Sequence, residues 1–330
     1  MPRTRGRPPA LAHPPAQRQA GLTLAELLVA MVLTTLVILA AAATLGMTRQ
    51  GFLAVDAASQ LRDNARFATT LLQQLAAQAG YRDLPNATDA TGSSLCSGFA
   101  TAETTGTALP VEGADDAIVK QGSAAFVASS YKNSGQQPVY SDLLVLRANL
   151  VKPGCDDAEN DQVLLNCRGL AQNVSADASA FSAVESYLFV DHKENNAEPA
   201  LYCGAYGENA GSSLQVEPLI AGVETLQVLY GVNAGDDPNN IAEGSANYQY
   251  KRAAAVTAAS QWRHVRAIRI GLVLRSATPG AAENAAATYY PLGEAYASAA
   301  DPGTVFVAPA DGRLRQVATF TVMLRNAIKD

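Results

Sequence analysis

Two groups of residues have types and spacings that could support chemistry. Gly21 stands five residues before Glu26, the one charge in the apolar run from Leu22 to Met47. A small residue beside an apolar run is typical of a peptidase site. A carboxylate near the hydrocarbon edge of a membrane is costly and usually finds a partner. The second group consists of four cysteines, Cys96, Cys155, Cys167 and Cys203.

All four cysteines follow the apolar run, and their even number in an exported chain predicts two disulfides. The sequence contains no CxxC, which argues against a zinc ribbon and against a thioredoxin-like redox pair. Four cysteines allow three pairings, and the spacing alone does not choose among them. We prefer Cys155 with Cys167, which would close a short acidic loop and leave Cys96 to pair with Cys203.

Catalytic and metal-binding patterns are absent from the sequence. His13, His192 and His264 lie far apart without metal-ligand spacing, and there is no GxSxG, Walker or GxGxxG motif. The acidic stretches 156–161 and 236–240 lack EF-hand spacing, so we expect them to be solvated. The sequence therefore predicts no enzymatic activity, no cofactor and no metal site.

The charge is distributed unevenly along the 330 residues. The chain is 48% hydrophobic and 16% charged, with a formal net charge of −6, which is a globular composition with a membrane-prone end. Residues 1–21 hold four arginines and no acid, so the remainder carries 20 basic residues (24 − 4) against 30 acidic ones, a net of −10. An acidic body argues against nucleic-acid binding, which needs clustered Lys and Arg.

The run from Leu22 to Met47 is long enough to cross a bilayer, because ~20 apolar residues span a ~30 Å hydrocarbon core. The preceding arginines should remain cytoplasmic, which places the residues after Met47 on the other side. Three interpretations compete: a signal anchor, a secretory signal cut near the small residues 41–43, and a segment processed after Gly21 and kept as a helix.

Beyond Met47 an amphipathic pattern continues, with apolar residues recurring in steps of three and four until Gly80. Joined to the apolar run, it predicts one helix of about 55 residues, ~80 Å long. Residues 81–131 have little periodicity and read mainly as loop with short strands. Strands are then expected at 141–147, 162–166, 186–191, 200–203, 214–221, 223–232, within 262–276 and at 316–325. Strands in series without helices between them predict an antiparallel sheet, hence an α+β fold.

The block GLTLAELLVA at residues 21–30 resembles a class III prepilin signal. It has a small residue before the cut, an apolar first mature residue and glutamate at the fifth mature position, although Leu22 stands where phenylalanine is usual. The segments 219–232 (LIAGVETLQVLYGV), 262–276 (WRHVRAIRIGLVLRS) and 320–326 (FTVMLRN) resemble, in that order, the PilW family of type IV pilus minor pilins. J-type secretion pseudopilins have a similar Trp-containing strand.

The resemblance implies a type IV pilin-like fold, with a long N-terminal helix packed on a C-terminal antiparallel β-sheet domain. It implies a leader at 1–21, a pilin helix at 22–80 whose part 22–47 is transmembrane, and a periplasmic globular domain at 81–330. Prepilin peptidase would cut after Gly21, Leu22 would become an N-methylated terminus, and Glu26 would register neighbouring subunits by pairing with the α-amino group.

The resemblance also implies partners and a location. The expected partners are other minor pilins, the major pilin, the prepilin peptidase and methyltransferase, the inner membrane and a PilY-type tip adhesin. The mature subunit would wait in the inner membrane as a single-pass protein and then join the pilus at the cell surface. Two alternatives remain open: a J-type pseudopilin of a type II secretion filament, and a membrane-anchored periplasmic enzyme or binding protein.

Overall fold

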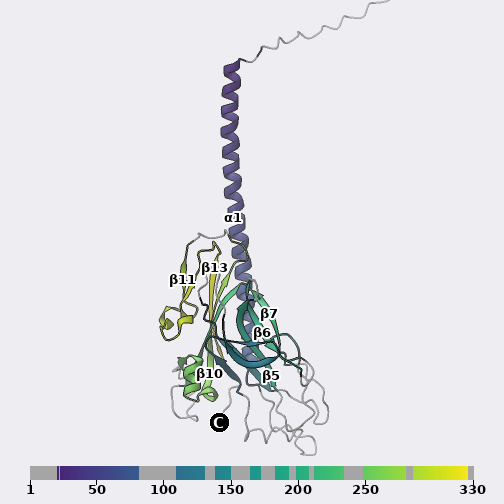
Figure 1. Cartoon of the computed structure of the whole chain (residues 1–330), viewed down its shortest axis with the longest axis vertical. Helices are drawn as coiled ribbons and strands as arrows, with labels where there is room; N and C mark the ends of the chain where they lie inside the picture. Colours follow the sequence, from purple (N-terminus) through teal and green to yellow (C-terminus); the bar gives the residue numbers. More distant parts are fainter. Residues whose placement is uncertain are drawn as a thin grey trace, which may run out of the picture. The chain divides into compact units, whose positions relative to one another are not determined.

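The structure is a computed structural model with two compact units, Met1–Gln50 and Gly51–Asp330. The residues that it describes are 21, 23–81, 109–130, 138–149, 164–171, 183–192, 198–207, 212–233, 248–279 and 285–325. The first unit contributes the beginning of the long helix, and the second contains the rest of that helix and the β-strands (Figure 1).

Helix α1 runs from Leu24 to Gln78 and has 55 residues, which confirms the single long helix predicted from the sequence. It ends where the periodicity ends. Gly80 adopts a φ of 73°, a left-handed conformation that glycine reaches without strain, and its N–H donates to the carbonyl of Arg147 at 2.8 Å. The end of the helix is thereby fixed to a strand of the sheet domain.

Two antiparallel sheets form the bulk of the second unit (Figure 1). Sheet 1 has the order β1-β4-β5-β6-β7, with bounds β1 Val111–Ala114, β4 Leu143–Asn149, β5 Ala183–His192, β6 Pro199–Ala205 and β7 Gln215–Ala221. Sheet 2 has the order β13-β10-β8-β9, with bounds β13 Arg315–Met323, β10 Val265–Arg275, β8 Val223–Asn233 and β9 Tyr248–Lys251. This arrangement confirms the predicted α+β class.

Smaller elements surround the two sheets. Two-stranded pairs are formed by β2 (Ala117–Lys120) with β3 (Ser123–Ala128) and by β11 (Ala287–Tyr289) with β12 (Phe306–Ala308). Helix α2 spans Ala253–Ala258, and short 3-10 turns occupy Trp262–His264, Glu294–Tyr296 and Pro302–Thr304. The segment expected as a strand at 162–166 is not one over its described residues: Leu165 makes only an isolated bridge to Ala171.

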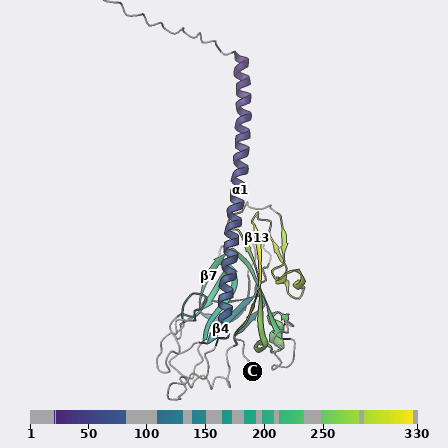
Figure 2. The same ribbon diagram turned by 180° about the vertical axis from the view of Figure 1, so that it is seen from behind.

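The part of α1 that belongs to the second unit packs its apolar stripe against both sheets. Its buried side chains are Ala57, Leu61, Ala65, Ala68, Leu72, Leu75 and Ala76. From Leu61 onward they share one cluster with Leu188 and Leu201 of sheet 1 and with Ile268 and Ile270 of sheet 2. Seen from behind, this part of α1 lies across the strands β4 and β7 (Figure 2). Burying each leucine contributes about 1.5–3 kcal/mol, so tertiary packing stabilises this half of the helix.

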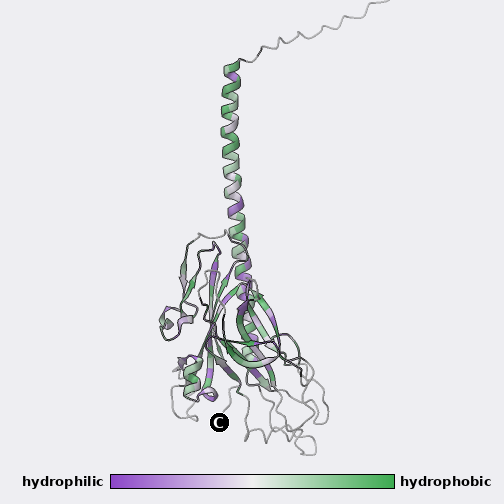
Figure 3. Ribbon diagram, in the orientation of Figure 1, coloured by the Kyte–Doolittle hydropathy of each residue, from purple (hydrophilic) through white to green (hydrophobic). Residues whose placement is uncertain are grey.

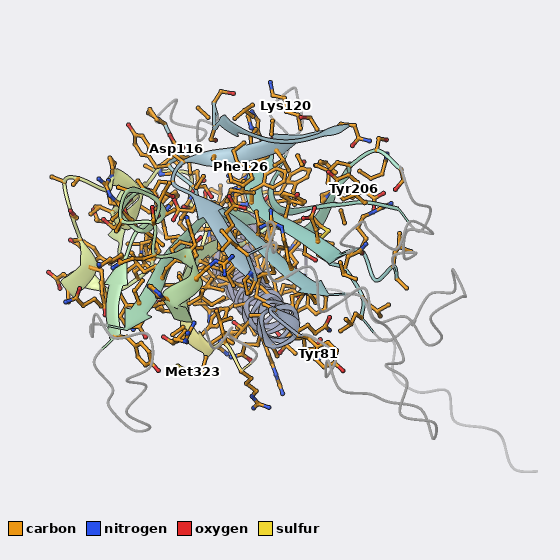
Figure 4. The ribbon with its side chains drawn as sticks, turned by 90° about the horizontal axis from the view of Figure 1, so that it is seen from below. Tyr81, Asp116, Lys120, Phe126, Tyr206 and Met323 are labelled. Carbon is orange, nitrogen blue, oxygen red and sulfur yellow. A yellow bond between two sulfur atoms is a disulfide. The ribbon has the colours of Figure 1, made fainter. Side chains whose placement is uncertain are left out.

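The opposite face of sheet 1 is covered by the β2–β3 hairpin. Ile118 and Val119 join Val145, Phe189 and Tyr202 in a second apolar cluster. Figure 4 places Lys120 and Phe126 of the hairpin across the domain from Tyr81 at the end of α1. The central strands β4 and β6 are therefore buried on both faces, which explains why LLVL at 143–146 and PALYCGA at 199–205 are mainly apolar and do not alternate.

Residues 140–142 join the two sheets before entering β4. The Ser141 hydroxyl exchanges hydrogen bonds with the carbonyl and N–H of Leu226, at 3.2 and 3.1 Å. The buried carboxylate of Asp142 accepts from the N–H of Val228 at 2.8 Å. Burial raises the pKa of Asp142 well above its usual value; the hydrogen bond from Val228 lowers it, and the charges of Asp115 and Asp301 raise it further.

The raised pKa of Asp142 predicts how the stability of the fold depends on pH. Below about pH 4 the carboxyl is protonated in the folded and the unfolded chain. As pH rises from the unfolded pKa toward the higher folded pKa, the carboxyl ionises in the unfolded chain first. The folded chain therefore loses stability until pH has passed its own pKa. Thermal melts at a series of pH values should therefore show the wild type losing stability, relative to Asp142→Asn, as pH rises above about 4. A difference that is independent of pH would contradict the burial argument.

Candidate functional site

The N-terminal end of α1 is closed by a reciprocal capping box. Thr23 is the residue before the helix, and both its N–H and its hydroxyl donate to Oε2 of Glu26, each at 2.9 Å. The N–H of Glu26 in turn donates to the Thr23 hydroxyl at 3.3 Å. This arrangement satisfies backbone donors that the first helical turn leaves without partners. Glu26 is thus fixed on the first turn, with its acidic group at the favourable end of the helix dipole.

Sequence reasoning identified Glu26 but missed Thr23. The signal was present as Thr-x-x-Glu immediately before an apolar run, which is the pattern of a capping box. Gly21 lies exposed before this cap. Leu22, the predicted first mature residue, lies outside the described residues.

The cap predicts a local effect for Thr23→Val. The loss of an N-cap costs about 1 kcal/mol, a factor of about five in the local opening equilibrium. Hydrogen exchange of the first-turn amides, in the full-length chain in detergent, should therefore accelerate by about fivefold. Thr23→Ser keeps the hydroxyl and should exchange like the wild type. Equal rates in all three proteins would show that the cap does not hold this end.

The first unit's part of α1 has the properties of a membrane span. It contains a window of mean hydropathy 2.5, and none of that window is buried. Figure 3 shows this stretch as almost continuously hydrophobic. The hydroxyls of Thr34, Thr35 and Thr44 donate to backbone carbonyls three or four residues earlier, at 2.6–2.9 Å. Such internal bonds let a threonine lie in lipid without an unsatisfied hydroxyl.

The cysteine pairing differs from the one that we preferred. Cys167 is bonded to Cys203, with a Cα–Cα distance of 5.9 Å. The preferred pairings of Cys155 with Cys167 and of Cys96 with Cys203 are therefore both wrong. The reason is that the turn at 166–168 is fixed over β5 and β6. The Cys167 N–H donates to the Ser186 hydroxyl at 2.9 Å, and the Asn166 amide donates to the Tyr206 carbonyl at 3.1 Å. Cys96 and Cys155 lie outside the described residues, so a second disulfide stays a prediction.

The three C-terminal segments that resemble one family become neighbours in sheet 2. β10 pairs with β8 on one side and with β13 on the other, so 219–232, 262–276 and 320–326 supply adjacent strands. Trp262 packs edge-on against Tyr230 of β8 at a centroid distance of 4.7 Å. Its indole N–H donates to the Thr257 hydroxyl at 3.0 Å. Trp262 thus closes the end of the sheet near α2.

An ion-pair network joins the same three strands. Glu224 of β8 is almost fully buried and accepts from two nitrogens of Arg315 on β13, at 2.6 and 3.0 Å. Arg275 of β10 lies 3.5 Å from Glu224 and makes two 2.9 Å bonds to Glu198. Asp311 adds two bonds of 2.8 Å to Arg315. Each side chain of this network has an oppositely charged partner. We therefore interpret the network as stabilising the sheet.

Within the described ranges, no group of three or more His, Cys, Asp or Glu side chains could hold a metal ion. The acidic stretch 156–161 and the stretch 236–240 lie outside those ranges, so their solvated state stays a prediction. Of the residues that the sequence singled out, the structure describes Gly21, Glu26, Cys167 and Cys203, and it adds Thr23 as the hydrogen-bond partner of Glu26.

Two models of known protein families match parts of this chain. Residues 187–326, from β5 to just beyond β13, match the model described as Type IV Pilus-assembly protein W. Residues 16–42, which include Gly21 and Glu26, match the model of the prokaryotic N-terminal methylation motif. Together these two matches support a minor pilin of the PilW family. Strands β8, β10 and β13 lie within the first matched region and the capped start of α1 lies within the second, so the resemblance inferred from the sequence is confirmed.

Other comparisons add the following about this PilW-family pilin. It is similar in structure to a type IV-like pilin from Thermus thermophilus, with 16% sequence identity and a TM-score of 0.36. The match covers 81% of this chain and 97% of that chain. A search of curated proteins gave no match.

Proposed function

We propose that prepilin peptidase cuts this minor pilin after Gly21 and that the new terminus, Leu22, is N-methylated. The observation that carries the proposal is the coincidence of three features. The methylation motif covers 16–42, the capping box closes the helix at Thr23, and the apolar helix begins at Leu24. The arginine-rich leader would remain cytoplasmic, which places the globular domain, residues 81–330, in the periplasm.

Glu26 would register each subunit against its neighbour during assembly. The two hydrogen bonds that it accepts from Thr23 both end on Oε2, so Oε1 keeps acceptor capacity toward a neighbouring subunit. The α-amino group of Leu22 from a neighbouring subunit can supply the opposite charge. In a low-dielectric helix bundle this attraction is much stronger than in water. The capping box would hold the carboxylate in a fixed rotamer before the neighbour arrives.

We further propose a structural, non-enzymatic role for the body. The subunit would join other minor pilins and the major pilin in a complex that primes or caps the pilus, with a PilY-type adhesin as a further tip partner. The buried network around Glu224 and the disulfide of Cys203 support this role, because they stiffen the domain. The alternative in the same class is a J-type pseudopilin of a secretion filament. Complementation of pilus-defective and secretion-defective strains separates the two.

Two substitutions of Glu26 test the charge argument. Glu26→Gln keeps an acceptor oxygen for the Thr23 cap but removes the charge, whereas Glu26→Ala removes both. Both variants should be cut after Gly21, because the peptidase acts before assembly, and both should be depleted from sheared pili. The measurement is an immunoblot of membrane and pilus fractions. If Glu26→Gln enters pili like the wild type, charge pairing is not what registers the subunit.

A further inference from the structure

The outer edge of sheet 2 is formed by β13, and none of the described strands pairs with it on that side. β13 pairs with β10 on one side only. Within the described ranges, no backbone hydrogen bond reaches the other side of residues 315–323. At about 3.4 Å per residue, these nine residues form an open edge ~30 Å long.

The register shows which amides this edge presents. The Leu324 N–H donates to the Arg266 carbonyl at 2.8 Å, and the ladder continues with Val322 opposite Ile268. In an antiparallel pair, alternate residues direct their N–H and C=O toward the partner strand. The residues between them direct theirs outward. The outward set is Val317, Thr319, Thr321 and Met323.

The sequence of β13 lacks the residues that usually prevent an edge strand from pairing with another strand. From Gln316 to Met323 it has no charge, no proline and no glycine. Its one charge, Arg315, is engaged by Glu224 and Asp311. Natural proteins usually protect such an edge with charges, prolines, bulges or short strands.

The other edges of the two sheets carry those protections. β7 has Glu217 and Pro218, and its Val216 N–H is taken by the side chain of Gln121 at 2.8 Å. β1 and β9 have four residues each, one with Glu112 and the other with Lys251. The free strand of the hairpin, β3, has six residues and an irregular register with β2. Only β13 among these edges is long, regular and uncharged over eight consecutive residues.

We propose that the outer edge of β13 pairs with an extended β-strand of another pilus subunit. Only a strand presents donors and acceptors at the spacing of this edge. The side chains of β13 also specify the partner. Phe320 and Val322 are half-buried against the main core, whereas Thr319 and Thr321 are exposed on the other face. The incoming strand should therefore be uncharged, with apolar residues on the side of Phe320 and polar ones on the side of Thr321. This inference rests on the proposed assembly with other subunits.

Photo-crosslinking tests the contact directly. The full-length chain, with p-benzoylphenylalanine at Thr321, is irradiated in piliated cells and its adducts are mapped by mass spectrometry. The expected result is an adduct to an uncharged, alternating segment of another pilus subunit. The same probe at Glu217 on the protected edge of β7 is the control and should give none. No adduct at Thr321, an adduct to a second copy of this chain, or one to a helix or charged loop overturns the proposal.

Proline at the edge tests the backbone contribution. Thr321→Pro removes one outward N–H, and edge strands tolerate proline at such positions. Thr321→Val keeps the N–H and is the matched control. Recovery in sheared pili should fall about tenfold for Thr321→Pro, as expected from the loss of one or two net hydrogen bonds, and stay unchanged for Thr321→Val. If Thr321→Pro does not melt like the wild type, Thr321→Lys serves instead, because it charges the edge and keeps the amide.

Different results would contradict the proposed function and the proposed strand pairing. If the wild-type chain is absent from the pilus fraction, the proposed function itself has failed. If the wild type is present and a folded edge variant is recovered equally well, only the strand pairing is overturned.

Discussion

Replacing Gly21 with valine should leave the protein uncut and outside the pilus. A branched side chain at this position would meet a peptidase site that accepts a small residue, so hydrolysis of the bond before Leu22 should stop. Without that cut there is no α-amino group at Leu22, and no partner for Glu26 of a neighbouring subunit. Immunoblots should show a precursor longer by the 21 leader residues, present in the membrane fraction and lost from sheared pili.

A second glycine provides the control for this experiment. Gly46 lies in α1, and a Cβ added there meets nothing within 4 Å. Gly46→Val should therefore be processed normally, because it makes the same substitution at a position far from the cut. Processing of Gly21→Val at the wild-type rate would contradict cleavage at this site.

Replacing Glu224 with alanine should be the most damaging substitution in the sheet domain. Its carboxylate bridges β8 to Arg315 of β13, and Arg275 of β10 lies beside it. Its removal takes one carboxylate from two buried arginines, which keep only Asp311 and Glu198 as partners. Breaking a buried pair costs about 3–5 kcal/mol when the remaining charge has no other partner, so we expect a loss toward the lower end of that range. That is a large part of the 5–15 kcal/mol by which domains are usually stable. Thermal and denaturant unfolding of the purified full-length chain measure the loss.

The matched control is Glu217→Ala. Glu217 also forms an ion pair, with Arg168 at 2.6 Å, but its side chain is 54% exposed. Exposed pairs contribute about 0–1 kcal/mol, so this variant should unfold like the wild type. Equal losses for Glu217→Ala and Glu224→Ala would show that burial is not what makes the Glu224 network stabilising.

The long helix and the order of the main strands were predictable because their signals are local. The periodicity that ends at Gly80 predicted the end of α1. The apolar residues from Val265 to Leu274 likewise predicted the buried strand β10. Gly21 and Glu26 could be proposed as site residues because both lie within one decamer that resembles a prepilin signal. Thr23 was not predicted, although Thr-x-x-Glu is an equally local pattern.

Features that depend on distant contacts were not predictable. The pairing of Cys167 with Cys203 follows from the way Ser186 and Tyr206 position the turn before β5, and spacing along the chain does not encode this. The joining of the sheets by Ser141 and Asp142 likewise depends on the edge of β8. The short strands β11 and β12 have three residues each, too few for a period to be recognised.

The most direct test of the central claim is the intact mass of the protein recovered from the membrane of its own cells. The account predicts a chain that begins at Leu22 and carries one additional methyl group, with the Cys167–Cys203 disulfide intact. A mass that corresponds to a start at Met1, or to a start near Thr44 after an ordinary secretory cut, would contradict it.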